Sequence, residues 1–260
     1  MTKRIVILTA ASLALVAGFI GCQGGQSKPP CLVGHGGFAM KYTPKAGQTL
    51  TGACADKKGE VVGFAPFYND GGTRQDGVGM KTATLTALED TPNVGLDPDH
   101  EIISMGTLTA IEPDKDDFCY APTLSKAEQH IPKGAVDPGD PDAGIDPTPA
   151  ADVNIVYNWS NVKFYVTPRA PGTQMAGELE YEEDGCTGKY DVVGVYPAVH
   201  CAVLDEDYNP VLTDAGTVAI DPTLCEKYND FGRTLSPEFP ITCDPDTQLC
   251  VLSKAPPAFK

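Results

Sequence analysis

Positive charge is scarce in this 260-residue chain. Nineteen Lys and Arg residues stand against 35 Asp and Glu residues, which gives a formal net charge of −16 at pH 7. A surface of this sign repels the phosphates of nucleic acids before any contact is made. We therefore expect no nucleic-acid partner.

The sequence also lacks the short motifs of common reactions and cofactors. It contains no Gly-x-Ser-x-Gly elbow, phosphate loop or dinucleotide fingerprint. Its cysteines form no Cys-x-x-Cys pair, as zinc, thioredoxin-like and haem sites require. The four histidines lie far apart in the chain and fit no ligand spacing; they are His35, His100, His130 and His200. We predict no catalytic residue and no bound metal, and expect surface or structural histidines.

A hydrophobic run long enough to span a bilayer is missing as well, since a spanning helix needs about 20 apolar residues. Residues Ile5 to Ile20 form an uncharged, mostly apolar run of 16 residues, and Lys3 and Arg4 precede it. A short positive segment followed by such a run is typical of a secretory signal peptide.

The end of this run, Phe19-Ile20-Gly21-Cys22, resembles the lipobox of bacterial lipoproteins. It has a bulky apolar residue at −3, a small residue at −1 and then the cysteine that receives the lipid. Ordinary signal-peptidase cleavage is the competing interpretation, but it requires small residues at −3 and −1, and no good Ala-x-Ala pair follows the apolar core.

The resemblance implies that Cys22 becomes a lipidated N-terminus, and two or more acyl chains anchor a protein stably. Gln23 stands where Asp marks lipoproteins retained in the inner membrane, so the resemblance implies the outer membrane. We expect the membrane, through the lipid, and an unknown envelope protein or glycan as partners.

Eight further cysteines remain for disulfides in an oxidising compartment; they are Cys31, Cys54, Cys119, Cys186, Cys201, Cys225, Cys243 and Cys250. Three precede a Pro/Asp-rich segment at residues 134–152 and five follow it, so complete pairing requires at least one bond across that segment. We expect Cys119 to make the crossing bond, because Cys31 and Cys54 are near enough to pair locally and Cys243 can close on Cys250.

Alternation of apolar and polar residues predicts an all-β fold. In Gln174 to Glu182, for example, Met175, Leu179 and Tyr181 face one way and glutamates face the other. We predict a sandwich-like body of one or two lobes, stabilised by disulfides, with at most one short helix at Ser125 to Ile131. Further strands are predicted at 38–43, 49–53, 60–64, 82–87, 101–111, 153–159, 162–167, 189–196 and 248–252.

The predicted organisation is a signal peptide (1–21), a lipidated cysteine with its tether (22–30), an N-terminal β half (31–133), a linker or loop (134–152) and a C-terminal β half (153–260). A faint echo links the halves: Thr43-Pro44 corresponds to Thr167-Pro168, and Val61-Val62-Gly63 to Val192-Val193-Gly194. Duplication of a β unit and coincidence both remain open.

Acidic clusters offer the hard oxygens that Ca²⁺ prefers. They are Asp137, Asp140, Asp142 and Asp146 in the linker, the group at 114–117, and Asp205, Glu206 and Asp207. Such runs are usually solvated loops. Tyr157, Trp159, Phe164 and Tyr165 could stack on a sugar or peptide, but core filling is the simpler interpretation.

We conclude that the sequence favours a lipid-anchored cell-envelope protein with a structural or binding role. A Ca²⁺-dependent binding or adhesion module is the first alternative, and an exported hydrolase that uses one of the histidines is the second.

Overall fold

The computed structural model describes residues 28–69, 71–72, 74–90, 96–131, 136–137, 148–149, 153–226 and 235–260. The predicted signal peptide, Cys22, Asp140, Asp142 and Asp146 lie outside the described residues. In the described part of the chain, no helix is long and apolar enough to cross a membrane.

Strands make up most of the described chain. They are β1 (Gly36–Pro44), β2 (Gly59–Tyr68), β3 (Gln75–Thr82), β4 (Ser104–Thr107), β5 (Phe118–Thr123), β6 (Ala127–Ile131), β7 (Val136–Asp137), β8 (Thr148–Pro149), β9 (Val153–Thr167), β10 (Ala170–Glu183), β11 (Cys186–Val195), β12 (Ile241–Asp244) and β13 (Leu249–Leu252). The helices are α2 (Gly52–Asp56), α3 (Ala83–Asp90) and the 3₁₀ turn η1 (Pro222–Cys225). The all-β fold class is confirmed, with two short α-helices in place of the one that the sequence predicts.

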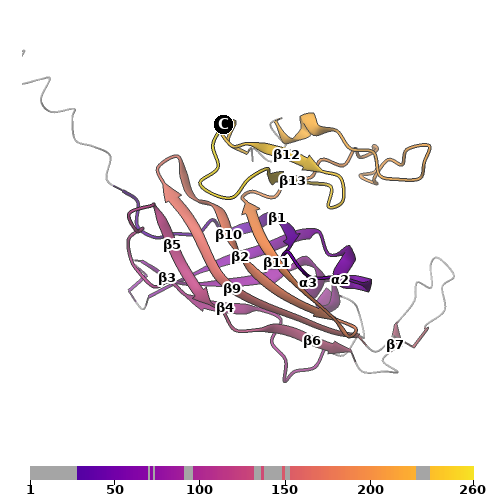
Figure 1. Ribbon diagram of the computed structural model, residues 1–260, viewed down its shortest axis with the longest axis horizontal. Coiled ribbons are helices and arrows are strands. Elements are labelled where there is room, and N and C mark those ends of the chain that lie inside the picture. The colour runs from indigo at the N-terminus through magenta and orange to yellow at the C-terminus, as the bar shows by residue number, and fades with distance from the viewer. Residues whose placement is uncertain are drawn as a thin grey trace, which may run out of the picture.

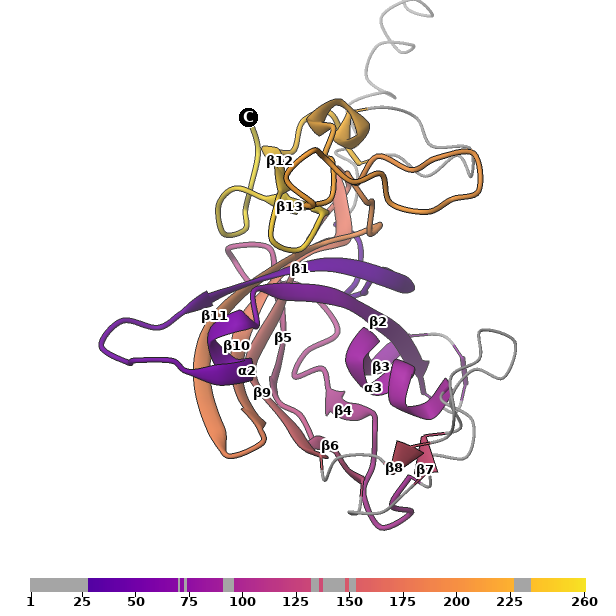
Figure 2. The ribbon, with the colours of Figure 1, turned by 90° about the vertical axis from the view of Figure 1, so that its right-hand side faces the viewer.

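Nine strands form one antiparallel sheet in the order β4-β3-β2-β1-β11-β10-β9-β5, with β6 also paired to β9 (Figure 1). The sheet curls until its two ends meet (Figure 2). Gly106 of β4 bridges Leu124 beside β5, and the Ser125 N–H donates to the Met105 carbonyl at 2.8 Å. The sandwich-like body therefore takes the form of a single, nearly closed sheet.

The inside of this sheet is filled with side chains. Alternate residues of each strand point inward, as in Phe38, Met40 and Tyr42 of β1, and the largest fully buried side chain is Trp159 of β9. Aromatic rings pack against one another across the interior, and the Phe64 and Phe164 ring centroids are 5.6 Å apart. These rings form the main core.

A bulge keeps the long strand β9 in register with this core. The sequence predicts two separate strands here, with odd-numbered residues inward up to Trp159 and even-numbered ones inward from Val162. The structure joins them, because the pairing with β10 shifts register between Ala176 and Glu178. Asn161 has a φ of 52° opposite this shift, a conformation that asparagine tolerates.

Several elements differ from their predictions. The strand expected at 101–111 is limited to β4, at Ser104–Thr107. The helix expected at Ser125 to Ile131 is strand β6, because its burial alternates and it pairs with β9. The strand expected at 82–87 is the end of β3 followed by α3, whose Leu85 N–H donates to the Thr82 hydroxyl at 3.3 Å. The strand expected at 49–53 runs instead into α2, which buries Cys54.

Both halves of the chain contribute to the same sheet, since β1 of the first half lies between β2 and β11. The similar motifs of the two halves lie on strands that do not occupy equivalent places in the sheet. The two motifs of the first half lie on the neighbouring strands β1 and β2, whereas the repeated pair lies at the end of β9 and in β11, with β10 between them.

The described C-terminal residues, 196–226 and 235–260, form a cap on the outer face of the sheet. The hairpin β12–β13 lies over β1 and β11, as Figure 2 shows. Leu249, Val251 and Phe239 of the cap share a second buried cluster with Ala39 and Val195, the outward-facing residues of β1 and β11. The cap therefore buries one outer face of the sheet.

Four disulfides connect the eight cysteines: Cys31–Cys119, Cys54–Cys186, Cys201–Cys243 and Cys225–Cys250. The prediction that at least one disulfide crosses residues 134–152 is confirmed, because one bond does so. The assignment of Cys119 to that bond is wrong, and Cys54 makes it.

The two local pairings are also wrong, for physical reasons. The Cys31 N–H donates to the Ile111 carbonyl at 2.7 Å, which holds Cys31 beside β5 and its Cys119. Cys243 and Cys250 are direct partners in the hairpin, but residues 199–201 bond to the same hairpin and bring Cys201 to Cys243.

An ion pair fastens the cap to the sheet. The Lys41 ammonium of β1 lies 2.8 Å from the Asp244 carboxylate of β12. Burial opposes ionisation of Asp244, but the hydrogen bond and charge of Lys41 and the N–H groups of Thr247 and Asp246 outweigh it and lower the pKa of the carboxyl.

Asp244→Asn is expected to lower the free energy of unfolding at pH 7 by about 2 kcal/mol, since a hydrogen bond to a charged group is lost. A depressed folded-state pKa gives stability that is present above the unfolded pKa of about 4 and lost as the pH falls through the folded value. Urea denaturation should therefore show a difference in the free energy of unfolding between the two proteins that is constant at neutral pH and becomes smaller below about pH 4. A difference that persists unchanged in acid would contradict the ion-pair account.

Candidate functional site

The aromatic residues that could have stacked on a ligand lie in two places, three of them fully buried and Tyr165 partly buried. Tyr157, Trp159 and Phe164 are inside the sheet, and each is at most 1% exposed. Tyr165 points to the outer face, where its ring packs against Phe259 of the cap. These side chains fill the cores.

A buried carboxylate organises the end of the sheet near α2 and α3. Glu60 of β2 has a side chain that is only 8% exposed. Its Oε1 accepts hydrogen bonds from the Tyr157 hydroxyl at 2.9 Å and the Tyr42 hydroxyl at 3.2 Å. Its Oε2 accepts from the backbone N–H and the hydroxyl of Thr84, at 3.0 and 2.9 Å. The Glu60 carboxylate thus accepts four hydrogen bonds from three residues.

Lys57 supplies the positive charge of this network. Its Nζ lies 2.8 Å from Glu60 Oε1 and 2.9 Å from the Thr84 hydroxyl. The same ammonium group lies over the rings of Tyr157 and Tyr181, 5.2 and 4.9 Å from their centroids. Burial and the negative charge of Glu60 raise the pKa values of Tyr42 and Tyr157 well above the usual range, so both stay protonated as donors.

This network has the parts of a cation-binding cage, but the chain's own Lys57 occupies it. The shallow pocket beside it has a volume of about 380 Å³ and is lined by Lys57, Thr84, Tyr181 and Glu183, among others. We interpret the network as a polar closure of this end of the core.

The histidines do not come together in the described part of the chain. His100 lies 3.0 Å from Glu128 and 3.6 Å from Asp97, in a loop packed on β6. His200 follows β11, and burial lowers the pKa of its imidazole. His35 precedes β1, and His130 is on β6.

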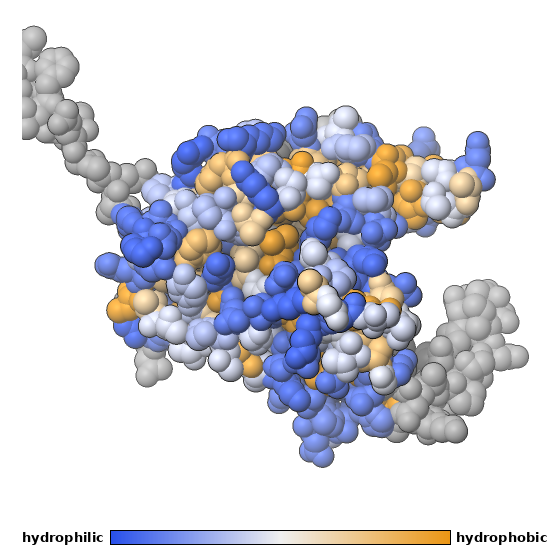
Figure 3. Space-filling model, viewed as in Figure 1, coloured by the Kyte–Doolittle hydropathy of each residue, from blue (hydrophilic) through white to orange (hydrophobic). Residues whose placement is uncertain are grey.

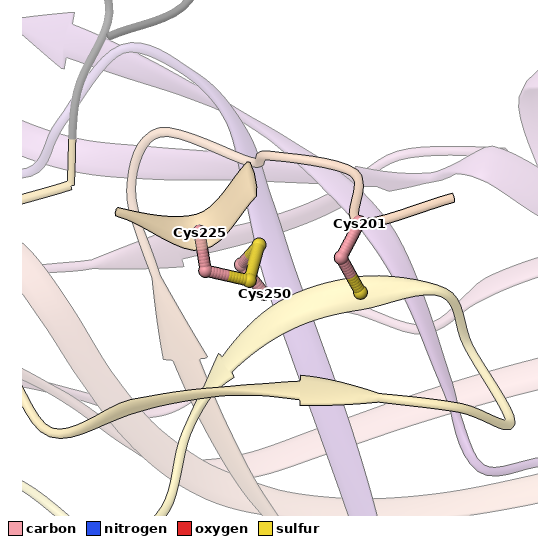
Figure 4. A group of neighbouring side chains, drawn as sticks. All are labelled: Cys201, Cys225 and Cys250. Carbon is pink, nitrogen blue, oxygen red and sulfur yellow. A yellow bond between two sulfur atoms is a disulfide. The ribbon is translucent and has the colours of Figure 1, made fainter. Parts of the chain in front are cut away.

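One group of potential metal ligands has close spacing among the described residues. The sulfur atoms of Cys201, Cys225 and Cys250 all lie within 4.8 Å of one another (Figure 4). All three are oxidised, with Cys243 completing the second bond. Metals bind the thiolate form of cysteine, so this cluster is a pair of adjacent disulfides that ties three segments of the cap together.

The described acidic clusters are engaged in their own turns. Asp114 Oδ1 accepts from the N–H groups of Asp116 and Phe118, each at 2.9 Å. Asp205 Oδ1 accepts from the N–H groups of Asp207 and Asn209 at the same distance. In both loops a carboxylate stabilises a turn.

Residues 201–226 form an arm that projects from the cap, seen as the orange loops extending to the right in Figure 1. The arm contains an octapeptide repeat, in which Val203-Leu204-Asp205, Val211-Leu212-Thr213 and Ala219-Ile220-Asp221 recur every eight residues. Sequence reasoning missed it because each unit is short, although the Val-Leu pair eight residues apart was visible.

Backbone hydrogen bonds give the three repeat units equivalent places. The Val203 N–H donates to Ala219 at 2.8 Å, Ala219 to Val211 at 2.7 Å, and Val211 to Val203 at 2.9 Å. Each unit therefore donates to one neighbour and accepts from the other, as three segments related by an approximate threefold axis would do.

Each of the three residues that make these bonds is followed by a residue with a large aliphatic side chain at the surface. Leu204, Leu212 and Ile220 are 46%, 62% and 37% exposed, whereas the residue before each of them is half-buried. We call these three side chains the aliphatic triad. Figure 3 shows hydrophobic residues on the projecting arm beside hydrophilic ones.

Comparisons with known proteins place the chain in a family. It is 28% identical over 271 residues to "Putative lipoprotein MlpA" of Myxococcus xanthus, and the alignment covers 100% of each protein. No solved structure matches the chain. The family model described as MlpA matches residues 36–197, which run from β1 through the end of β11. The chain therefore belongs to the MlpA family.

Proposed function

We propose that this chain is a lipid-anchored protein of the bacterial cell envelope, held at the outer membrane through Cys22, and that it acts by binding a partner. The anchor is supported by the apolar run that ends at Cys22 and by the name of the Myxococcus relative, which describes it as a lipoprotein. Gln23 supports the outer membrane over the inner one.

The observation that carries the binding role is the aliphatic triad on a projecting arm. The interior is occupied by aromatic side chains and the buried Glu60 network is occupied by Lys57, so both serve the fold. The arm instead exposes three large aliphatic side chains at equivalent positions of its repeat, and two disulfides hold its base. Apolar side chains that gather at the surface mark interaction sites.

We propose no chemical reaction for this protein. Asp114 and Asp205 are engaged by backbone N–H groups, which argues against a calcium site at either cluster.

Cys22→Ala tests the anchor. Without the cysteine there is no thioether and no acyl chain, so the variant is expected to leave the membrane fraction, while the unaltered chain stays in it. Fractionation of cells that express each form measures this. A variant with Cys31→Ala serves as the control, because it breaks the Cys31–Cys119 disulfide and keeps the cysteine at position 22. Equal membrane retention of the Cys22 variant would rule the anchor out.

A further inference from the structure

The aliphatic triad has a defined geometry because the arm repeats. Three bridges of the same construction link the units in turn, and they pair Ala202 with Ile220, Leu204 with Pro210, and Leu212 with Val218. Positions related by an approximate threefold axis lie at the same level along that axis. Leu204, Leu212 and Ile220 therefore form one ring at the same level of the arm.

Turns of equal construction hold this ring in place. The N–H groups of Tyr208, Gly216 and Leu224, again eight residues apart, donate to the carbonyls of Asp205, Thr213 and Asp221 at 2.9–3.2 Å. The arm is also fixed at its base, where Cys201 and Cys225 are bonded to the hairpin β12–β13. Such pre-organisation lowers the entropy cost of binding.

The arm that carries the triad has charge of one sign. Residues 201–226 contain no Lys or Arg, and they contain six acidic residues: Asp205, Glu206, Asp207, Asp214, Asp221 and Glu226. An apolar centre with a charged rim is the usual anatomy of a protein interface, and complementary charge on the partner speeds its association.

We propose that the aliphatic triad is the docking surface for a different envelope protein, whose matching surface is an apolar recess rimmed by Lys and Arg. This inference rests on the proposed binding role and specifies the chemistry of the partner. A second copy of this chain is disfavoured because two acidic rims would repel each other, and an anionic lipid surface is disfavoured for the same reason.

Photo-crosslinking in intact cells tests this proposal. The full chain carries the photoreactive residue p-benzoylphenylalanine in place of Leu212, and a matched chain carries it in place of Ile111, which is 51% exposed and lies outside the arm. We expect a discrete protein adduct from position 212 and none from position 111. Mass spectrometry of the adduct should identify a protein other than this chain.

The charge of the rim is tested in the same cells. Glu206→Gln, Asp207→Asn and Asp214→Asn are combined in the Leu212-labelled chain, since these side chains are not the ones that cap the arm's turns. Loss of electrostatic steering should reduce adduct formation roughly tenfold. An unchanged thermal midpoint shows that the triple variant is folded.

Several outcomes would overturn the proposal: no adduct from position 212, an equal adduct from position 111, an adduct of two copies of this chain, an adduct with lipid alone, or a yield that the charge substitutions leave unchanged. Fractionation of the same cells separates this failure from failure of the anchor. A membrane-bound chain without an adduct refutes the docking surface only, whereas a chain absent from the membrane refutes the lipid anchor.

Discussion

Replacing Cys54 and Cys186 together by Ser is expected to lower the free energy of unfolding by about 5 kcal/mol. This bond joins α2 to the start of β11 and closes 132 residues of chain. The cost of closing so long a loop in the unfolded state is removed by the bond, and the chain-entropy relation gives roughly 5 kcal/mol for it. Urea denaturation of the oxidised proteins measures the difference.

A matched control uses the shorter loop of the cap. Cys225 and Cys250 are separated by 25 residues, for which the same relation gives roughly 3.5 kcal/mol. The Cys54 and Cys186 pair should therefore be the more costly one to remove. A smaller loss for the long loop than for the short one would contradict the entropic explanation.

The crossing bond has a direct chemical signature. Cleavage of the chain within residues 134–152 should leave a single band in electrophoresis without reductant and two bands after reduction. Two bands without reductant would show that the halves are not joined.

Glu60→Leu is expected to destabilise the protein by about 3–5 kcal/mol, because it leaves the Lys57 ammonium without its counter-charge in a buried place. The substitution also takes the acceptor away from the Tyr42 and Tyr157 hydroxyls. Thermal or urea unfolding of the variant measures the loss.

Two further variants show whether the buried charge is the cause. Glu178→Leu breaks an exposed pair with Lys45 and should cost at most about 1 kcal/mol. Lys57→Met added to Glu60→Leu removes the stranded charge, so the double variant should be more stable than Glu60→Leu alone. A double variant that is less stable would show that Lys57 contributes through packing rather than charge.

Local alternation predicted β10 and, in two pieces, β9. β10 carries Met175, Leu179 and Tyr181 on one face, and burial of one face imposes that period on the sequence. The same rule fails for the Thr and Ala run at 82–87, where alternation of small residues carries little burial information and a Thr82 cap starts a helix.

Closure of the sheet could not be predicted in the same way. The bridge between Gly106 and Leu124 depends on the curvature accumulated over all the intervening strands, which no local pattern records. The disulfide partners depend on the same long-range geometry. The prediction of a crossing disulfide needed no such geometry, because it followed from the odd number of cysteines on each side of residues 134–152. The structure contains that disulfide.

The candidate site could be predicted from the sequence only in part. The acidic residues at 205–207 were visible as a cluster, but their place in a repeat depends on Leu204, Leu212 and Ile220, which look like ordinary strand residues. Only the structure shows that these side chains are exposed at equivalent positions.

Lipid attachment at Cys22 is the central claim, and the mass of the mature N-terminus tests it most directly. The protein purified from membranes is expected to begin at Cys22 and to carry a diacylglyceryl thioether and an N-acyl chain. An unmodified N-terminal peptide that begins at another residue, or a chain that retains Met1, would contradict it.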